Sequence, residues 1–500
     1  MTHAETPTDL SPIPTERLRA SLERAGQLVG VHGTLPATIN AITDDSRRVV
    51  PGSCFVALRG SARDSHEFLP TVGAAGATCA IAEAVSGASV PVLQVRDGRV
   101  AAAVAAAAFY GEPATALRFV GVTGTNGKST TVGILRHLLD APDAPAASIG
   151  TLGVLVGGAG AVLPGGSGLT TPGPIELQRV LRALVDAGVR RVAMECSSHA
   201  LDQGRVVGVR FDAAVFTNLT RDHLDYHGTM EAYRDAKAKL VGLLGPGGTA
   251  VVNADDRWWD GLPAAPRRLT FALAATADVR VTDLTLTPSG SAFTLVTPAG
   301  AVRATLPLMG DFNVANALGA VGAALTLGLD PATIAARLAT VPQVSGRLEL
   351  LGHRPTVLRD YAHTPDAYER VLTALRPYTP GRIILVFGCG GDRDRGKRPL
   401  MAAAAHRFAD HLVLTDDNPR TEDPERILDD IGAGLPVGAR YDRIRDRREA
   451  IARAIAMADP ERDLVLLVGK GPDTYQIYGT TKTPFDEKPI VEALLAERSV

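Results

Sequence analysis

Residues 117–139 read LRFVGVTGTNGKSTTVGILRHLL, and this stretch decides the fold of the middle of the chain. Its apolar start, Leu117–Thr123, is typical of a buried strand, and the pattern from Thr130 to Leu139 is typical of a helix. A glycine loop lies between them. Glycines let backbone N–H groups approach phosphate oxygens, and the N-terminus of the following helix adds positive potential. The order of strand, glycine loop and helix therefore predicts a phosphate loop that binds a nucleotide.

The loop is one residue shorter than the general Walker pattern, because only two residues separate Gly124 from Gly127. It keeps the Gly-Lys-Ser core. We expect Lys128 to reach the β- and γ-phosphates and Ser129 to be a ligand of Mg²⁺. A glycine turn without nucleotide is the alternative, and the flanking strand and helix argue against it. The predicted ATP-binding residues of the loop are Gly124, Thr125, Asn126, Gly127, Lys128, Ser129 and Thr130.

Strands and helices alternate on both sides of this unit. Further strands of the middle region are predicted at Arg190–Cys196, Ala213–Asn218 and Thr249–Asp255, which indicates a mostly parallel sheet with crossover helices. Residues Val279–Leu308 alternate polar and β-branched side chains around PSG and PAG turns, so we expect antiparallel strands attached to the α/β core.

A first region precedes this core and a third follows it. The first contains strands at Cys54–Leu58 and Pro91–Val95, a buried Ala-rich helix near Val100–Ala108, and a linker at Phe109–Pro113. The third has buried strands that end in polar loops, which predicts a second open α/β sheet with function at the strand C-termini; they are Arg382–Gly388, His411–Asp417 and Asp463–Gly469. We predict three α/β domains, at residues 1–110, 111–345 and 346–500.

The bulk properties agree with a three-domain protein of the cytoplasm. The chain has 500 residues, and a typical domain has about 150. Its net charge of −2 gives no electrostatic reason to expect nucleic acid or an anionic membrane as partner. The four cysteines have neither disulfide nor metal-ligand spacing. The N-terminal MTHAETPTDLSP has no basic segment followed by an apolar one, so no secretory signal is expected, and no apolar run is long enough to span a bilayer.

Carboxylates and histidines follow two of the central strands. Glu195 ends a predicted strand, a position that faces the ligand in nucleotide-binding folds and suits Mg²⁺. The segment from Asp222 to His227 holds two aspartates and two histidines. Zinc is conceivable there, but phosphates and hard oxygen ligands suit Mg²⁺ better, with His223 as the candidate nitrogen ligand. By its helical setting alone, Lys237 would be a solvated lysine.

Two polar loops end neighbouring strands of the third region. GCGGDRDRGKRP (Gly388–Pro399) contains Arg393, and DDNPR (Asp416–Arg420) ends in Arg420. A guanidinium group is a planar fork that suits bidentate binding of a carboxylate. Either arginine alone is more often a surface residue, but together they indicate a substrate that carries a carboxylate.

These motifs together resemble the Mur ligase family of bacterial cell-wall synthesis, and the MurE type most closely. GTNGKST, MECSSHALDQGRV, FTNLTRDHLDYHGTMEAYRDAKAKL, GDFNVANALGA, GRLELL, DYAHTPDA, GCGGDRDRGKRP and DNPR occur in that order along nearly the whole chain. The resemblance implies an N-terminal domain for a UDP group, a central phosphate-loop ATPase, and a C-terminal Rossmann-like domain that brings the incoming amino acid. It also implies roles in peptidoglycan synthesis, cell shape and cell division.

The resemblance assigns a role to each matching residue. Lys128, His223 and Lys237 would be catalytic, and Lys237 would be carbamylated, which turns a cation into an anion able to bind a second Mg²⁺. The metal ligands would be Ser129, Glu195, His223 and Lys237. The ATP site would be completed by Asn313, Asn316, Arg347 and Asp360. UDP-linked muramyl dipeptide would be bound by Ser46, Ser61, Ala62, Arg63, Thr170, Thr171, Ser197, Gln203 and Arg205. The amino acid would be bound by Arg393, Asp417, Asn418, Pro419, Arg420, Gly469 and Asp473.

The implied reaction uses ATP to activate a carboxylate. The glutamate γ-carboxylate attacks the γ-phosphate, the resulting acyl phosphate is attacked by the amine of the incoming amino acid, and phosphate leaves. Two Mg²⁺ ions and Lys128 would offset the developing charge. Because no side-chain nucleophile is required, catalysis would rest on positioning and on closure of the domains around the substrates. A monomer is expected.

The identity of the added amino acid is the property that the sequence constrains least. DNPR is associated with meso-2,6-diaminopimelate, but the family usually continues with Gly-Lys-Gly-His-Glu, and here Pro472 and Asp473 replace the last two residues. Leu169 stands where asparagine often precedes the threonine pair. Two ligase alternatives stay open: a MurE-like enzyme that joins another amino acid or carboxylate, in secondary metabolism, and a folylpolyglutamate-synthetase-like enzyme. The alternative of another class is a nucleotide-binding protein that makes no bond.

Overall fold

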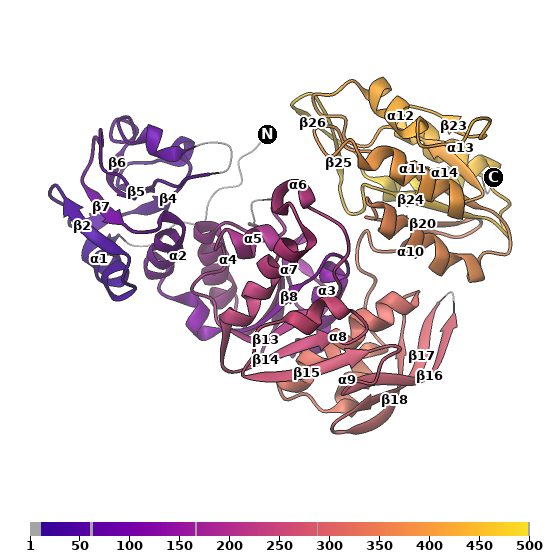
Figure 1. The fold of residues 1–500 in the computed structure, drawn as a ribbon, viewed down its shortest axis with the longest axis horizontal. Coiled ribbons are helices and arrows are strands. Elements are labelled where there is room, and N and C mark those ends of the chain that lie inside the picture. The colour runs from indigo at the N-terminus through magenta and orange to yellow at the C-terminus, as the bar shows by residue number, and fades with distance from the viewer. Residues whose placement is uncertain (1–11, 61–63, 166–167, 288, 499–500) are drawn as a thin grey trace.

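The protein folds into three lobes, each built on its own β-sheet (Figure 1). The structure, a computed structural model, describes residues 12–60, 64–165, 168–287 and 289–498. The N-terminal segment examined for a secretory signal therefore lies almost entirely outside the described residues. Along the described chain, no helix combines the length and the apolar character that crossing a membrane requires.

The N-terminal lobe is a five-stranded sheet with two helices. Its strand order is β2 (Leu28–His32), β7 (Val92–Val95), β6 (Ala77–Ala82), β5 (Ser53–Val56) and β4 (Ala41–Thr43), and only the β2–β7 pair is antiparallel. α1 (Thr15–Arg24) and α2 (Gly98–Phe109) pack on it, and β1 (Ile13–Pro14) pairs with β3 (Thr38–Ile39). The predicted Ala-rich buried helix is α2.

The central lobe contains an eleven-stranded sheet. In spatial order the strands are β11 (Ala161–Leu163), β10 (Gly153–Val156), β9 (Ala146–Gly150), β12 (Arg191–Glu195), β8 (Arg118–Thr123), β13 (Phe211–Phe216), β14 (Leu244–Asn253), β15 (Arg267–Ala272), β16 (Val279–Thr287), β17 (Gly290–Thr297) and β18 (Gly300–Leu306). Strands β9, β12, β8, β13, β14, β15 and β16 run parallel to their neighbours in that order, whereas β17 and β18 continue as antiparallel strands. The antiparallel extension predicted from Val279–Leu308 is confirmed.

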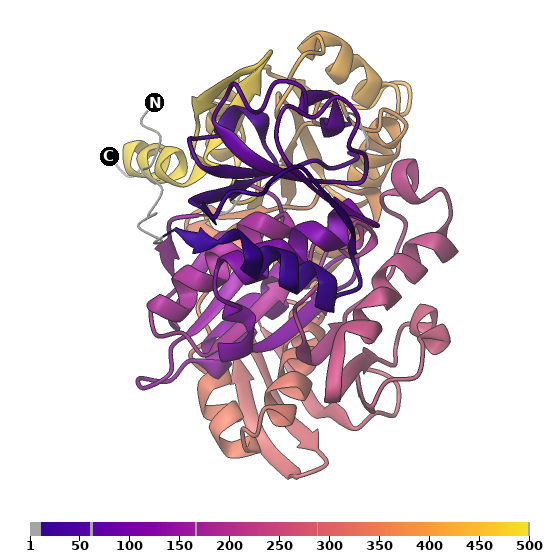
Figure 2. The same ribbon diagram turned by 90° about the vertical axis from the view of Figure 1, so that its left-hand side faces the viewer.

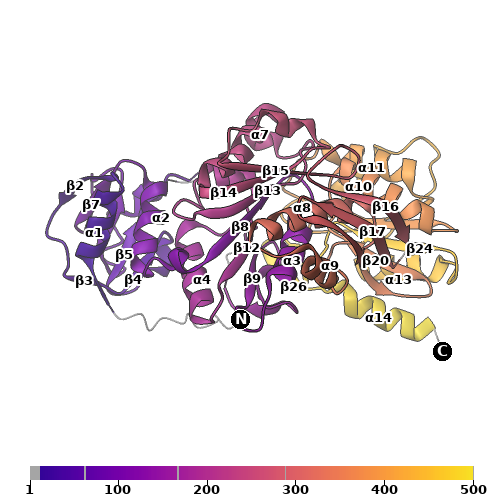
Figure 3. The same cartoon turned by 90° about the horizontal axis from the view of Figure 1, so that it is seen from below.

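Helices cover both faces of the central sheet. They are α3 (Lys128–Leu139), α4 (Pro174–Asp186), α5 (Ser198–Asp202), α7 (Met230–Ala238), α8 (Asp311–Thr326) and α9 (Pro331–Leu338), whereas the short α6 (Leu224–His227) buries no residue and contacts α7. Val120 and Val122 of β8 pack with α3 and α8 in one hydrophobic cluster, whereas Phe119 packs with α4 in another. Figure 3 shows α4 on one side of β8 and α3 and α8 on the other. The strand that leads into the phosphate loop is therefore buried on both faces, as expected for a parallel sheet.

The C-terminal lobe is a six-stranded sheet of mainly parallel strands. Their order is β19 (Glu349–Gly352), β20 (Thr356–Asp360), β24 (Leu464–Val468), β21 (Ile383–Phe387), β22 (His411–Leu414) and β23 (Asp442–Arg443). The helices are α10 (Pro365–Leu375), α11 (Lys397–Phe408), α12 (Pro424–Gly432), α13 (Arg447–Met457) and α14 (Glu487–Arg498), and β25 (Tyr475–Tyr478) pairs with β26 (Thr481–Pro484). All residues of β21 and β24 are buried, which explains their continuous apolar sequences.

The N-terminal and C-terminal lobes flank the central lobe. Figure 1 places the N-terminal and C-terminal lobes at opposite ends of the molecule, and Figure 2, the side view, shows both above the central sheet. Strands β8 and β12 of the central lobe and β20 of the C-terminal lobe each end in a loop that reaches one shared cavity. The predicted α/β class is confirmed, and this cavity is where most of the residues predicted to bind ATP lie.

Candidate functional site

The phosphate loop connects the end of β8 to the start of α3. Gly124 and Gly127 have φ values of 149° and 85°, a region that side chains rarely adopt. A Cβ on Gly127 would collide with Oδ1 of Asn316 on α8, and one on Gly124 would collide with Oγ1 of Thr217. Both glycines are therefore required by backbone conformation and by close packing, independently of any nucleotide.

Two lysines point at one carbonyl group of this loop. Nζ of Lys128 donates to the Gly124 oxygen at 2.9 Å and to the Thr125 oxygen at 2.8 Å, and Nζ of Lys237 donates to the same Gly124 oxygen at 2.7 Å. Burial lowers the pKa of Lys128, while the carboxylates of Glu195 and Asp222 act in the opposite direction. The loop thus holds the Lys128 side chain where phosphates would approach.

Lys237 is not the solvated lysine that its helix pattern suggested. It is only 1% exposed, and its ammonium lies 4.4 Å above the ring of Tyr233. Burial, and then the neighbouring charge of Lys128, hold its pKa well below the ordinary value of 10.5. That interpretation was wrong because the Cα periodicity of α7 does not reveal that the helix lies against the phosphate loop.

A cavity of about 970 Å³ opens at the phosphate loop, and both the central and the C-terminal lobes line it. The predicted site residues that it brings together are Thr125, Asn126, Gly127, Lys128, Ser129, Thr130, Thr170, Glu195, His223, Asn313, Asn316, Arg347 and Asp360. Lys237 lies behind the phosphate loop and does not line the cavity. Asp222, His363 and Asp366 also line the cavity.

Hard oxygen donors lie beside the loop. The carboxylate of Glu195 is 2% exposed and accepts hydrogen bonds from the N–H of Thr151 at 2.9 Å and from its hydroxyl at 3.3 Å. The Ser129 hydroxyl accepts from Nη2 of Arg347 at 2.9 Å. Thr151 was missed from the sequence because it belongs to no phosphate-binding or acidic motif.

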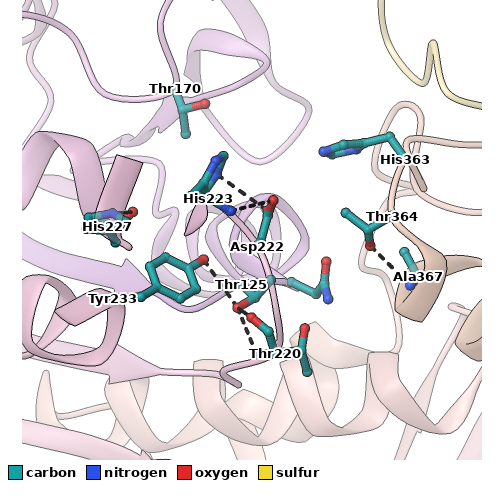
Figure 4. A network of polar contacts seen from close by, with 12 residues as sticks. Thr125, Thr170, Thr220, Asp222, His223, His227, Tyr233, His363, Thr364 and Ala367 are labelled. Carbon is teal, nitrogen blue, oxygen red and sulfur yellow. Dashed lines mark hydrogen bonds and ion pairs between the residues drawn. The ribbon is translucent and has the colours of Figure 1, made fainter. Parts of the chain in front are cut away.

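Two histidines, His223 and His363, line the cavity, and His199 packs against the first of them. His223 has a φ of 53°, and its ring lies 4.8 Å from that of His199. Burial lowers the pKa of His223 to about 4, although Asp222, with a carboxylate oxygen 3.4 Å from Nε2, favours the protonated form. Figure 4 shows Asp222 and His223 on one side of the opening and His363 on the other. Sequence reasoning missed His199 and His363, although both lie inside the quoted motifs.

The threonine pair of LTTPG is joined to the end of β12 by hydrogen bonds. The Thr171 hydroxyl donates to the Glu195 carbonyl at 2.7 Å and accepts from the Ser197 N–H at 3.1 Å. Nη1 of Arg205 donates to the Thr171 carbonyl at 3.1 Å, and its Nε donates to Oε1 of Gln203 at 3.0 Å. Four of the residues predicted to bind the muramyl dipeptide, Thr171, Ser197, Gln203 and Arg205, thus form one polar network.

The predicted UDP contacts belong to the N-terminal lobe. Ser46 is half-buried and begins a 3₁₀ turn that Asp45 caps, since the Asp45 carboxylate accepts from the Arg47 N–H at 3.0 Å. Ser61, Ala62 and Arg63 lie outside the described residues.

Segments that enter the C-terminal lobe complete the nucleotide side of the cavity. The Arg347 guanidinium lies 4.7 Å above the ring of Tyr361. The Asp360 carboxylate accepts from the N–H groups of Leu348 at 2.8 Å and Ala362 at 2.7 Å, and burial raises its pKa. On α8, Nδ2 of Asn316 donates to Oδ1 of Asn313 at 3.2 Å.

The residues predicted to bind the amino acid gather at the C-terminal ends of β21, β22 and β24. Arg420 has a φ of 53°, and its Nη1 donates to the Gly391 carbonyl at 2.8 Å. Oδ1 of Asn418 accepts from the Ile477 N–H at 3.0 Å. A Cβ on Gly469 would lie 2.6 Å from the Asp417 carboxylate. The buried Lys470 was missed, although it belongs to the GKGPD run.

Two members of the predicted amino-acid set differ in exposure. Arg393 is exposed, and its one hydrogen bond within the described residues goes to the carbonyl of adjacent Asp392, at 3.1 Å. Asp473 is half-buried, and burial raises the pKa of its carboxyl group, whereas the Lys470 charge lowers it.

Comparison with known proteins identifies the family. Models described as Mur ligase middle domain and as Mur ligase, glutamate ligase domain match residues 122–324 and 346–471. A protein of Synechococcus elongatus named UDP-N-acetylmuramoyl-L-alanyl-D-glutamate–2,6-diaminopimelate ligase is 47% identical over 481 residues, 93% of this chain and 96% of that protein. The chain belongs to the Mur ligase family.

Further relatives agree. A protein of the same name from Geobacillus thermodenitrificans is 46% identical over 472 residues, 92% of this chain and 95% of its own. A solved structure of a protein of that name superposes with a TM-score of 0.64 at 35% identity, covering 93% of this Mur ligase and 96% of that chain. The predicted MurE-type resemblance and the predicted class, an ATP-dependent ligase, are confirmed. The roles of individual residues of this Mur ligase stay predictions.

Proposed function

We propose that this Mur ligase joins 2,6-diaminopimelate to the D-glutamate γ-carboxylate of UDP-N-acetylmuramoyl-L-alanyl-D-glutamate, with ATP as the energy source, in peptidoglycan synthesis. The observation that carries the proposal is the cavity between the lobes. The phosphate loop of the central lobe and the segment Tyr361–Thr364, which follows β20 of the C-terminal lobe, both line it. The named relatives that match along more than nine tenths of the chain support the substrates.

The chemistry needs positioning rather than a side-chain nucleophile. An oxygen of the γ-carboxylate attacks the γ-phosphorus of ATP, the bond to ADP breaks, and an acyl phosphate forms. The amine of diaminopimelate then attacks the acyl carbon, loses a proton and expels inorganic phosphate. Lys128, held at the phosphate loop, offsets the charge that develops on the transferred phosphoryl group.

The donor set beside the loop fits Mg²⁺. The Ser129 hydroxyl and the Glu195 carboxylate are hard oxygen donors lining the same cavity as Lys128, and His223 adds a ring nitrogen that burial keeps neutral. When bound, Mg²⁺ supplies positive charge to the phosphate oxygens.

Lys237 is suited to carbamylation. A lysine attacks carbon dioxide as the neutral amine, and burial beside Lys128 favours this neutral form. Its conversion to a carbamate would place an anion beside Lys128, whose Nζ donates to the same Gly124 carbonyl. Incubation with ¹³C-bicarbonate should give a carbamate carbon resonance in the wild-type protein and in Lys239→Ala, whose lysine is exposed, but not in Lys237→Met. A resonance that persists in Lys237→Met would contradict this assignment.

Opposite charges in the C-terminal lobe suit a diamino acid. Arg420 and Asp473 follow the C-terminal ends of β22 and β24, two strands of the same parallel sheet. We assign a carboxylate of the amino acid to the Arg420 fork and an ammonium to Asp473. Asp473 is one methylene shorter than the glutamate that the family usually carries.

The three lobes divide the substrates among them. We assign the UDP group to residues 1–110, ATP to residues 111–345 and the incoming amino acid to residues 346–500. We still predict that the protein is a monomer and that it acts in the cytoplasm. We also predict that neither nucleic acid nor membrane is a partner.

Substrate-dependent phosphate release tests the function. Purified protein with ATP and Mg²⁺ should release phosphate only when both the UDP-dipeptide and an amino acid are present, and mass spectrometry should find the ligated product. meso-Diaminopimelate should give the highest kcat/KM in a panel with LL-diaminopimelate, L-lysine, L-ornithine and L-alanine. Preference for another amine would contradict the proposed substrate, and release without a new amide bond would contradict the ligase function.

A further inference from the structure

A buried arginine lies behind the loops that we assign to the amino acid. Arg398, near the start of α11, has a fully buried side chain. Its Nη2 donates to Oε1 of Glu422 at 2.9 Å, and its Nη1 donates to Oε2 of the same carboxylate at 3.1 Å. Nη1 also donates to Oδ2 of Asp430 at 2.8 Å, and Nη2 to the Gly390 carbonyl at 3.2 Å. The two charged side chains therefore form a bidentate pair.

Glu422 joins this pair to the loop after β21. Its Oε1 accepts from the N–H of Asp392 at 2.5 Å, and its Oε2 lies 2.8 Å from Nη2 of Arg395. The hydrogen bonds from Arg398 contribute most to lowering the pKa of Glu422 from 4.5 to about 2. Glu422 stays ionised at neutral pH and holds the loop after β21 by one end.

The loop after β21 in turn contacts the loop that carries Arg420. The Gly391 N–H donates to the Asn418 carbonyl at 2.9 Å, and the Thr421 hydroxyl donates to the Asp392 carboxylate at 2.8 Å. A Cβ on Gly391 would collide with the Pro419 carbonyl oxygen. The two backbones are therefore in direct contact, and a shift of one must move the other.

Arg420 depends on this contact for its orientation. Its Nη1 donates to the Gly391 carbonyl, and its backbone is held in a left-handed conformation by the bond from its N–H to the Ile477 carbonyl, at 3.0 Å. Within the part of the chain that the structure describes, Nε and Nη2 of Arg420 have no hydrogen-bond partner. The guanidinium is thus fixed on one side and keeps donors available on the other.

We propose that Arg398 and Glu422 are positioning residues for the amino-acid site, a buried ion pair that fixes the two strand-end loops and thereby the guanidinium of Arg420. The inference rests on the proposed function, because the proposed function supplies the ligand of the site that Arg398 and Glu422 would support. A binding group must be held to within about 0.5 Å by its supporting shell to be effective. Removal of one partner breaks the bidentate pair and leaves the other with a single, more exposed charged partner, Asp430 for Arg398 or Arg395 for Glu422, so the loops would relax.

Steady-state kinetics of Glu422→Gln and Arg398→Met test the proposal. Glu422→Gln keeps the size of the side chain, so it also covers the case in which Arg398→Met does not fold. We expect the KM for diaminopimelate to rise about tenfold or more in both variants, more in Arg398→Met. The KM values for ATP and the UDP-dipeptide should stay within about twofold. Hydrogen bonds to charged groups, at about 1.5–3 kcal/mol, correspond to roughly ten- to hundredfold changes.

The matched control is Arg382→Met. Arg382 makes an arginine–carboxylate pair with Asp463 in the same lobe, in which Nε and Nη2 donate to Oδ2 at 3.0 and 2.8 Å, but this pair is more exposed and lies at the amino end of β21, away from the loops. It should lower the melting temperature without changing the KM for diaminopimelate. An unchanged KM in Glu422→Gln, or a rise equal for all three substrates, would overturn the positioning role. Wild-type protein that does not turn over diaminopimelate would instead overturn the proposed function.

Discussion

At the scale of single residues, the phosphate loop depends on the absence of side chains. Gly127 combines a φ of 85° with contact to the Asn316 amide, whose carbon would lie 3.0 Å from an added Cβ. Asn316 is itself held by its hydrogen bond to Asn313, so it cannot move without loss of that bond. The loop geometry is therefore set by packing against α8 as well as by glycine.

Gly127→Ala should weaken nucleotide binding. The left-handed backbone and the displaced Asn316 together cost about 1–3 kcal/mol, which predicts a five- to hundredfold rise in the Kd for ATP. Isothermal titration calorimetry measures this change. Gly242→Ala is the control, because a Cβ there has no atom within 4 Å. Equal ATP affinity in the two variants would disprove the packing argument.

Glu422 should make the C-terminal lobe sensitive to acid. A carboxyl group whose pKa falls from 4.5 to about 2 on folding stabilises the folded state above pH 4.5, and this contribution is lost as the pH falls towards 2. The wild type should therefore be more stable than Glu422→Gln at pH 6, and the difference in melting temperature should shrink between about pH 4.5 and 2. Scanning calorimetry at several pH values tests this, and a constant difference would contradict the low pKa.

At the scale of elements, a second buried ion pair attaches the last helix. Glu487 begins α14, and Arg447 begins α13; both side chains are fully buried, with 2.8 Å between Nε and Oε1. Nη2 of Arg447 also donates to the Val468 carbonyl at the end of β24, at 2.9 Å. Two helices and the strand that leads to Gly469 thus share one charged contact.

Arg447→Met should destabilise the C-terminal lobe by about 3–5 kcal/mol, because Glu487 would be left as a buried, unpaired charge. The double variant Arg447→Met with Glu487→Met should recover most of that loss, since it buries apolar groups of similar size in place of the pair. Urea unfolding followed by circular dichroism compares the three proteins. A double variant no more stable than the single one would show that the carboxylate is not the source of the loss.

At the scale of the whole molecule, small polar contacts hold the C-terminal lobe against the phosphate loop. The Asp366 carboxylate, in the first turn of α10, accepts from Nδ2 of Asn126 at 3.4 Å and from the Thr220 hydroxyl at 3.2 Å. The Arg347 to Ser129 bond adds a third link. Each of these contacts is weak, which suits lobes that must separate to exchange substrates.

Asp366→Ala should therefore open the molecule. The loss of two hydrogen bonds, at about 0.5–1.5 kcal/mol each, should shift the population of lobe arrangements and increase the radius of gyration in small-angle X-ray scattering. The KM for ATP should also rise several-fold. Asp429→Ala, which removes an exposed ion pair with Arg443 on the same lobe, should change neither quantity. An unchanged radius of gyration in Asp366→Ala would show that these contacts do not set the arrangement.

Local sequence patterns were sufficient to predict several of the helices and strands. The apolar runs of β8, β21 and β24, the alternation from Val279 onward, and the phosphate loop all gave elements within a few residues of the observed bounds. These signals are local, because strand periodicity and glycine loops are encoded by residues next to one another in the chain. The resemblance to the Mur ligase family rests on the same kind of local signal, since its motifs are short ordered runs of sequence.

The tertiary structure alone decided which side chains meet and which are buried. The helix pattern made Lys237 a solvated residue, whereas α7 packs it behind the phosphate loop. His363 and Asp366 reach the cavity because the C-terminal sheet packs beside the central lobe, and Thr151 reaches it because β9 lies next to β12 in the central sheet. Burial, pKa shifts and contacts between lobes arise from residues far apart in the chain, so no local pattern contains them, whereas the chemistry of each motif was already determined by the sequence.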